Sequence, residues 1–363
     1  PPVRPWPGRG AVSPAPAQVR QGGWWIGYGG PINGGAGIRL GRPDGTDDHW
    51  AMPEVPLPPK GWQVHPDWSP DGHRLAFASD DAGDAGAEFT RDLWVANADG
   101  PDARRVLDCK DPCISADAPA WSPDGRTLAF VTWDSTPTTG LPSLVLLDLK
   151  THTVRTLLTV KRDVESYFWP RWSPDGRHLV LELQRWSDAS PNATLAETAI
   201  ATITVDDPSS TLKQLTNWSL SATYPDWSST GDRIVYSTRS WDQVSGPSNL
   251  YTIKPDGSGL KALTNDREIR ATQPTWTPDG SHIMFTNVEG TGFGNPMMAT
   301  IRSDGPELVS ATLSGPLFGT HPQLRPKARQ PAFITTCRVS SPWDVCRHCR
   351  SSVFAPCHGP GCC

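Results

Sequence analysis

The phrase Trp-Ser-Pro-Asp-Gly occupies residues 68–72 and recurs at residues 121–125 and 172–176. Modified copies follow, Trp-Ser-Ser-Thr-Gly at residues 227–231 and Trp-Thr-Pro-Asp-Gly at residues 276–280. The tryptophans of successive copies are 53, 51, 55 and 49 residues apart. A nearly constant period of this length is typical of repeat proteins, in which each supersecondary unit buries its apolar face by stacking on its neighbours.

Each repeat is predicted to hold four short strands. Proline presets φ in a tight turn and glycine accepts a positive φ, so Ser-Pro-Asp-Gly turns one strand back onto the next. The apolar strand after this turn is residues 75–78, 128–131, 179–182, 234–237 or 283–286. A second hairpin follows, most clearly at residues 93–106. Two hairpins in series predict an all-β chain built of propeller blades.

The two ends of the repeat region each hold half a blade. Residues 38–50 have the pattern of a second hairpin without a first, and residues 321–334 have that of a first hairpin without a second. Joined, the two halves make a sixth blade, and ring closure leaves no open sheet edge. We therefore predict a six-bladed β-propeller with one blade closed between N- and C-terminal segments. Residues 24–28 are an alternative source of that blade's second strand.

The repeats resemble those of the TolB-type β-propeller, a family of extracytoplasmic six-bladed domains with WD40-like repeats. The resemblance covers roughly residues 38–334, and the phrase is specific for the repeat type rather than for an activity. Similar propellers are binding scaffolds in the Tol envelope system, lid domains of prolyl-oligopeptidase-type serine peptidases, and lyases of pectate fragments. This sequence differs from all three, because it shows neither a separate N-terminal Tol-type domain nor a hydrolase domain. It also has a cysteine-rich tail.

Composition predicts three regions. Residues 1–23 are rich in Pro, Gly, Ala and Arg without periodicity, which indicates a disordered lead or linker. The β-propeller is predicted for residues 24–336. Residues 337–363 contain six of the eight cysteines and are expected to be a disordered tail, although Cys346 and Cys349 have a spacing that can bind zinc, and disulfides are a third alternative.

Charge and cysteine usage limit the partners and the compartment. The formal net charge is −5 with acids and bases interspersed, which argues against nucleic acid and against an anionic membrane surface. No apolar run is long enough for a membrane span. Cys109 and Cys113 form either a disulfide or two free thiols, and a disulfide would agree with the periplasmic or extracellular location that we expect, although no export signal is visible. A monomer is expected.

Enzyme signatures are absent from the sequence. There is no Gly-x-Ser-x-Gly elbow, His-Glu-x-x-His motif, phosphate loop or dinucleotide glycine signature. Four carboxylates occupy the same turn of successive blades and are interpreted as turn-capping groups: Asp71, Asp124, Asp175 and Asp279. The tryptophans of the phrase are interpreted as buried anchors of the blades: Trp68, Trp121, Trp172, Trp227 and Trp276.

One position varies from blade to blade. An X-Pro pair begins three residues before each anchor, and X is His65, Ala118, Trp169, Tyr224, Gln273 or His321. Equivalent positions on six blades must form a ring, which we place at one mouth of the central channel. Scaffold residues should be alike, whereas this ring mixes polar groups with flat apolar faces, as a concave ligand site does.

The ring predicts a binding function. We expect a non-catalytic scaffold that binds a protein or peptide through His65, Trp169, Tyr224, Gln273 and His321 at the channel mouth. No cofactor is predicted, except that His65 and His321 would lie on adjacent blades and can together ligate a divalent metal. The alternatives are an enzyme-associated propeller, either a channel-metal lyase or a detached peptidase lid, and a sugar-binding module that stacks on Trp169 and Tyr224.

Overall fold

The computed structural model divides the chain into two compact units, Pro1–Ala328 and Arg329–Cys363. All residues that it describes lie in the first unit: 25–32, 35–42, 47–51, 63–80, 90–98, 102–110, 113–134, 142–159, 165–187, 194–238, 247–265, 270–288, 296–305, 308–310 and 320–326. The predicted lead at 1–23 and the tail at 337–363 lie outside the described residues, so their assignment remains a prediction.

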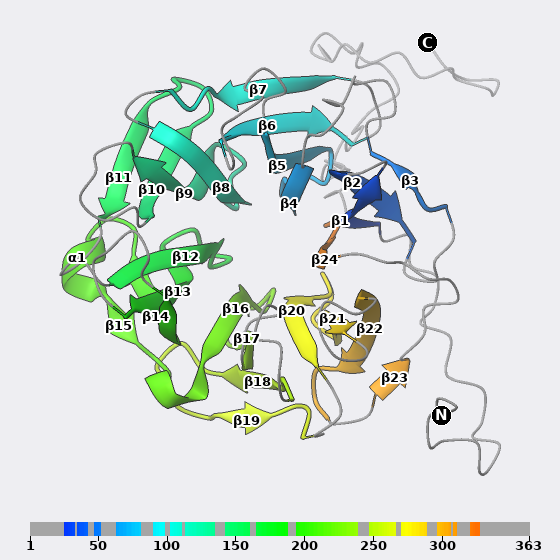
Figure 1. The fold of residues 1–363 in the computed structure, drawn as a ribbon. Helices are drawn as coiled ribbons and strands as arrows, with labels where there is room; N and C mark the ends of the chain where they lie inside the picture. Colours follow the sequence, from blue (N-terminus) through cyan, green and yellow to red (C-terminus); the bar gives the residue numbers. More distant parts are fainter. Residues whose placement is uncertain are drawn as a thin grey trace, which may run out of the picture. The chain divides into compact units, whose positions relative to one another are not determined.

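Six four-stranded antiparallel sheets are arranged as the blades of a ring (Figure 1). Blade 1 consists of β4 (Gln63–Trp68), β5 (Arg74–Asp80), β6 (Arg91–Asn97) and β7 (Ala103–Leu107). Blade 2 consists of β8 (Cys113–Trp121), β9 (Thr127–Asp134), β10 (Ser143–Asp148) and β11 (Val154–Leu158). Blade 3 consists of β12 (Glu165–Trp172), β13 (His178–Trp186), β14 (Leu195–Thr204) and β15 (Lys213–Gln214).

The remaining blades follow the same plan. Blade 4 consists of β16 (Ala222–Trp227), β17 (Ile234–Thr238), β18 (Leu250–Ile253) and β19 (Lys261–Ala262). Blade 5 consists of β20 (Ala271–Trp276), β21 (His282–Val288), β22 (Pro296–Arg302) and β23 (Leu308–Ser310). Two short helical turns, α1 (Pro208–Thr211) and η1 (Trp218–Leu220), follow strands of blade 3. The predicted all-β, six-bladed propeller is confirmed.

Blade 6 joins the two ends of the repeat region, with one correction to the prediction. Its strand order is β24 (Thr320–Leu324), β1 (Ile26–Ile32), β2 (Gly35–Gly41) and β3 (His49–Trp50). The second strand is therefore the N-terminal β1, the alternative that residues 24–28 offered, and not residues 331–334, which lie outside the described residues. Strand β1 pairs with both β24 and β2. Three of the four strands of this blade, β1, β2 and β3, therefore come from the N-terminal side.

The Ser-Pro-Asp-Gly turns are held by their own side chains. In blade 2, the Ser122 hydroxyl donates to Asp124 at 2.6 Å, and Asp124 also accepts from the backbone N–H of Arg126 at 3.1 Å. Gly125 has a φ of 70°, which a residue with a Cβ rarely adopts. Asp71, Asp175 and Asp279 make the same two bonds in their blades. The four carboxylates are therefore turn caps, as predicted.

The apolar core is divided among the blade interfaces. Among the described residues there are six clusters of buried side chains, and each draws its members from two adjacent blades. At the closing interface, Ile26 and Tyr28 of β1 pack with Met284 and Met298 of blade 5 and with Leu324. Burial is thus spread around the ring, which lets a long chain fold as one propeller without a single large core.

Three of the anchor tryptophans donate hydrogen bonds to a neighbouring blade. The indole N–H of Trp172 donates to the carbonyl of Ala120 at 3.2 Å, and that of Trp227 donates to the carbonyl of Arg171 at 3.2 Å. Trp68 donates to the carbonyl of Gln323 at 3.1 Å and so closes the ring. Trp68, Trp121 and Trp227 are buried, whereas Trp172 and Trp276 are partly buried and pack at the edge of their clusters.

No helix among the described residues has the length and apolar character needed to cross a membrane.

Candidate functional site

The X-Pro pairs occupy a bulge in the innermost strand of each blade. His65, Ala118, Trp169, Tyr224 and Gln273 have φ values of 55°, 50°, 49°, 52° and 55°. At each of them the pairing register with the second strand shifts. A left-handed backbone costs a residue with a Cβ roughly 1–2 kcal/mol, and a bulge redirects the side chain that it carries. The same strained bulge therefore recurs in five blades and sets the direction of each X side chain.

Three of the predicted ring residues are in contact in series, with Trp169 between His65 and Tyr224. The rings of His65 and Trp169 meet edge to face with centroids 4.6 Å apart, and the Trp169 and Tyr224 centroids are 4.9 Å apart. His65 is in blade 1 and Trp169 in blade 3, so this contact passes over blade 2, whose X residue is the small Ala118. The bulges thus bring together side chains that are more than 100 residues apart in the sequence.

The other predicted ring residues behave differently. Gln273 is buried and its side-chain oxygen accepts from the Thr286 hydroxyl at 3.2 Å, so it is part of the packing of blade 5. Tyr224 is also buried, with 6% of its surface exposed. His321 lies in β24, where the pairing with β1 is again irregular, but its side chain lies outside the described residues.

Two further aromatic residues extend the contact and were not found from the sequence. Phe168, directly before Trp169, packs against that indole with centroids 4.8 Å apart. Trp133, at the end of β9, packs against Phe168 at 5.6 Å. We call His65, Trp169, Phe168 and Trp133 the aromatic run. Phe168, Trp169 and Trp133 are each partly exposed, and Phe168 was detectable only as the neighbour of the variable position.

A buried acid fixes His65. The carboxylate of Asp117, the residue before Ala118, lies 2.5 Å from His65 Nδ1. It also accepts a hydrogen bond from the Arg91 guanidinium at 2.5 Å. Burial alone would raise the pKa of Asp117, but the charges and hydrogen bonds of His65 and Arg91 outweigh it and lower the pKa to about 2. An Asp-His pair orients an imidazole; here it also joins blade 1 to blade 2.

A second ring of side chains lies two residues further along each innermost strand. Arg171 donates to Asp67 at 3.1 Å, and Asp226 accepts from the Thr275 hydroxyl at 3.0 Å and from the backbone N–H of Trp276 at 2.9 Å. We call Asp67, Arg171, Asp226 and Thr275 the charged belt. It connects four blades through residues that the sequence does not mark as partners.

Two carboxylates share one guanidinium in the charged belt. Burial raises the pKa of Asp67 to about 6; Arg171 opposes this rise, and the nearby negative charge of Asp226 adds to it. Burial likewise raises the pKa of Asp226, again against the effect of Arg171. Both shifts favour the protonated acid in the folded protein.

We expect the charged belt to make stability fall as pH rises from about 4 to about 6. In this window the folded protein binds more protons than the unfolded chain, so ionisation at higher pH destabilises it by at most on the order of 2–3 kcal/mol. Asp226→Asn should reduce this dependence, because it removes the titration of Asp226 and its negative charge beside Asp67, while burial still raises the pKa of Asp67. Urea denaturation at pH 4.5 and pH 7 tests this prediction. An equal change in the free energy of unfolding for both proteins would contradict it.

The predicted metal site stays a prediction. Among the residues that the structure describes, no three His, Cys, Asp or Glu side chains are grouped as metal ligands. The Nδ1 atom of His65 is paired with Asp117, which leaves Nε2 as its ligating atom. The other proposed ligand is His321, whose side chain is not described.

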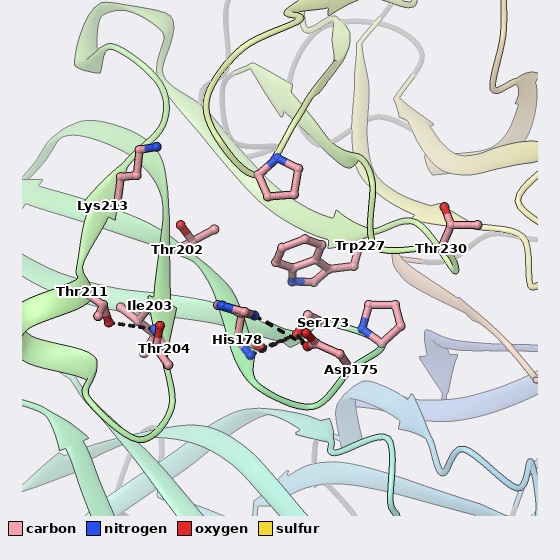
Figure 2. Close-up of a pocket in the computed structure, with 13 residues that line it drawn as sticks. Ser173, Asp175, His178, Thr202, Ile203, Thr204, Thr211, Lys213, Trp227 and Thr230 are labelled. Atoms are coloured by element: carbon pink, nitrogen blue, oxygen red, sulfur yellow. Dashed lines mark hydrogen bonds and ion pairs between the residues drawn. The ribbon is translucent and has the colours of Figure 1, made fainter.

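Two grooves lie at the opposite end of the ring, beside the Ser-Pro-Asp-Gly turns. The first, of about 360 Å³, lies between blades 3 and 4 and is lined by His178, Lys213 and Trp227 (Figure 2). The second, of about 400 Å³, lies between blades 4 and 5 and includes Lys261 and Trp276. Neither contains a residue of the predicted ring.

The two grooves share one construction. Lys213 donates to the carbonyl of Asp256 at 2.8 Å, and Lys261 donates to the carbonyl of Asp304 at 2.7 Å. In both cases the lysine of one blade reaches the Asp-Gly turn of the next. The grooves are therefore repeated inter-blade features, whereas the mouth differs from blade to blade.

Cys109 and Cys113 form a disulfide, the first of the two alternatives left open by the sequence. The bond closes the connection between β7 and β8, and the backbone N–H of Cys109 donates to the buried Asp92 at 2.7 Å. A disulfide is typical of proteins from oxidising compartments.

Comparison with known proteins gives local similarity in sequence and wider similarity in structure. No protein-family model matches the chain. The Tol-Pal system protein TolB of Alcanivorax borkumensis is 36% identical over 97 residues, which cover 26% of this chain and 19% of that protein. The uncharacterized peptidase YuxL of Bacillus subtilis is 28% identical over 159 residues, which cover 34% of this chain and 22% of that protein. The matched part thus spans only about a fifth of these curated relatives.

The fold comparison covers most of the chain. The crystal structure of TolB from Acinetobacter baumannii superposes with a TM-score of 0.57 at 18% sequence identity, over 84% of this chain and 67% of that one. At this identity the similarity concerns the fold. Together with the six blades, it confirms the predicted resemblance in fold to a TolB-type propeller.

Proposed function

We propose that this chain, a six-bladed β-propeller of the TolB type, is a non-catalytic scaffold that binds a protein or peptide at the channel mouth. The observation that carries the proposal is the meeting of His65, Trp169 and Tyr224, which come from three different blades. The Alcanivorax relative is named as a protein of the Tol-Pal system, which agrees with a partner-binding role here.

The variability of the mouth supports a role beyond scaffolding. Anchors, turn acids and inter-blade lysines repeat from blade to blade because each performs the same packing task. At the X position the backbone strain repeats, but the side chain changes from histidine to alanine, tryptophan, tyrosine or glutamine. Strained backbone is retained where the surrounding structure over-determines it, often at ligand sites. Partly exposed aromatic groups beside buried polar groups are typical of binding surfaces.

The expected setting is the periplasm or the extracellular space, with the propeller acting as a monomer. The Cys109–Cys113 disulfide supports an oxidising compartment. Ring closure supports a self-contained unit, because each described sheet is paired within the same chain and no blade is left incomplete.

Partner capture tests this function. The propeller would be immobilised and exposed to envelope and secreted proteins of the source organism, with bound proteins identified by mass spectrometry. Trp169→Ala should lose the captured partner because it removes the centre of the aromatic run. Trp94→Ala is the matched control, since Trp94 is a partly buried tryptophan on β6, the third strand of its blade. If Trp169→Ala is folded and still captures every partner, mouth binding is wrong.

A role as the propeller of an enzyme is the second candidate, because one relative is named as a peptidase. A metal lyase or a peptidase lid would need groups beyond those at the described mouth. Stoichiometric metal in protein purified without chelator, lost in His65→Ala, would favour the lyase. Binding of an oligosaccharide that depends on Trp169 would instead favour the sugar-binding module.

A further inference from the structure

The groove between blades 3 and 4 has the size of a small-molecule site. One side is formed by β14 and β15 of blade 3, and the other by Trp227 and Pro255 of blade 4 (Figure 2). Its volume of about 360 Å³ lies within the range of roughly 300–1,000 Å³ that is typical of ligand pockets. The groove is therefore a second place, apart from the predicted ring, at which a ligand can bind.

A change at one position of the repeat leaves this groove open. In blade 1, Arg74 stands two residues after the turn glycine, and its guanidinium lies 4.6 Å from the ring centroid of Trp121 in blade 2. In blade 3 the equivalent residue is His178, whose shorter side chain is paired with Asp175 of its own turn at 3.6 Å. Space that an arginine fills beside Trp121 is thus left beside Trp227.

Hydrogen-bond acceptors in the groove are only partly used by the protein. The hydroxyls of Thr202 and Thr204 make no hydrogen bond to another described residue, and both residues are partly exposed. In Asp175, Oδ1 accepts from the Ser173 hydroxyl and from the backbone N–H of Arg177, whereas Oδ2 has no partner in the described part of the chain. These oxygens remain available to a ligand.

Donors lie on the same groove. The Lys213 ammonium has three N–H groups, and its bond to the carbonyl of Asp256 uses one of them. The side chain of His178 is 44% exposed and adds a ring nitrogen. One small cavity therefore combines hydroxyls with a carboxylate that only accepts and an ammonium that only donates.

Flat apolar rings complete the lining. Trp227 is 8% exposed and forms part of the wall, while the rings of Pro174 and Pro255 are more open to solvent. A few polar groups set among apolar rings are typical of small-molecule sites. The ligand should accordingly have an apolar face as well as several hydrogen-bonding groups.

We propose that the groove between blades 3 and 4 binds a neutral sugar. This inference goes beyond the proposed function, because it adds a site at the other end of the ring. Each sugar hydroxyl both donates and accepts, so sugar hydroxyls can pair with Thr202 and Thr204 as well as with Asp175 and Lys213. The C–H face of a sugar ring is apolar and packs against the apolar rings of the lining.

The charges that line the groove favour a neutral ligand over an ion. They are the Asp175 carboxylate and the Lys213 ammonium, with the titratable imidazole of His178 beside them. A cation would lie beside the ammonium and an anion beside the carboxylate, and contact between like charges weakens binding. A polyol uses the same groups as hydrogen-bond partners and brings no charge of its own.

Three neutral trisaccharides test the inference: cellotriose, maltotriose and chitotriose. Binding would be followed by isothermal titration calorimetry and saturation-transfer NMR, with inorganic phosphate, N-acetylarginine amide and triglycine as comparison ligands. At least one trisaccharide should bind at millimolar concentrations, and the comparison ligands should not. Its affinity should be the same at low and high salt, because a neutral ligand has no charge for salt to screen.

Variants locate the site. Thr202→Val and Thr204→Val keep the shape of the side chain and should each weaken sugar binding about two- to tenfold through loss of one hydrogen bond. Thr156→Val is the matched control, since Thr156 is an exposed threonine on the outer strand β11 of blade 2, and it should leave the affinity unchanged. His178→Arg should abolish binding, because it restores the arginine that covers Trp121 in the equivalent position.

The results separate the groove from the channel mouth. Absence of trisaccharide binding, preference for phosphate, N-acetylarginine amide or triglycine, or an affinity unchanged in His178→Arg and in both groove threonine variants would overturn the inference. Trp169→Ala should bind the sugar as the original protein does, and loss of the sugar in that variant would assign it to the mouth instead. Failure of the groove leaves partner capture at the mouth untouched, since Trp169 is not among the groove residues.

Discussion

Deletion of everything before His65 should cause the propeller to aggregate and to melt at a lower temperature. The deletion removes β1, β2 and β3, three of the four strands of blade 6, and leaves β24 without a partner within its sheet. It also removes Ile26 and Tyr28, which cover Met284, Met298 and Leu324 of the closing interface. The exposed strand edges and apolar side chains are then free to pair with other molecules.

Deletion of residues 1–23 is the matched control, because it ends before β1. That variant should remain monomeric, with the melting temperature of the full chain. Size-exclusion chromatography with light scattering and a thermal melt measure both properties. A monomeric product with an unchanged melting temperature after the longer deletion would contradict the closed blade.

Replacement of Trp121 by alanine should destabilise the protein by roughly 3–5 kcal/mol. Trp121 is 5% exposed and packs with side chains of blades 1 and 2, and the Arg74 guanidinium lies 4.6 Å from its ring centroid. Asp124→Ala should cost only about 0.5–2 kcal/mol, since it removes turn hydrogen bonds at the surface. Denaturant titration gives both free energies.

Trp121→Phe separates packing from hydrogen bonding. The Trp121 indole nitrogen is buried and has no hydrogen-bond partner among the described residues, so Trp121→Phe loses no hydrogen bond. It reduces the ring volume and weakens the contact with the Arg74 guanidinium. The loss in the free energy of unfolding should be well below that of Trp121→Ala. Equal free energies of unfolding for Trp121→Ala and Asp124→Ala would show that this tryptophan is not a packing anchor.

The mouth was only partly predictable from the sequence. The X-Pro spacing grouped His65, Trp169 and Tyr224, because equivalent positions of a cyclic repeat face the same axis, and in the structure Trp169 contacts the other two. It also grouped Gln273, which the structure buries within blade 5. The pattern located the strand position, but it contained no information on how far each side chain reaches or what covers it.

The sequence by itself determined the repeat, the turns and the number of blades. These depend on local chemistry that recurs within each copy: proline and glycine in a tight turn, a hydroxyl bonded to an aspartate two residues on, and alternating apolar strands. Such contacts join residues only a few positions apart. A single copy of the phrase is therefore enough to specify a turn, and the number of copies, together with the two half-blades, gives the number of blades.

Only the tertiary structure decided which residues meet across the ring. Asp117 with His65, Arg171 with Asp67 and Trp133 with Phe168 are contacts between different blades. The choice of β1 as the second strand of blade 6 likewise required the two ends of the repeat region to come together. These pairings depend on bulges that redirect side chains and on small residues such as Ala118 that leave space between larger ones. Sequence spacing does not encode those distances, because they arise only once six blades close around a common axis.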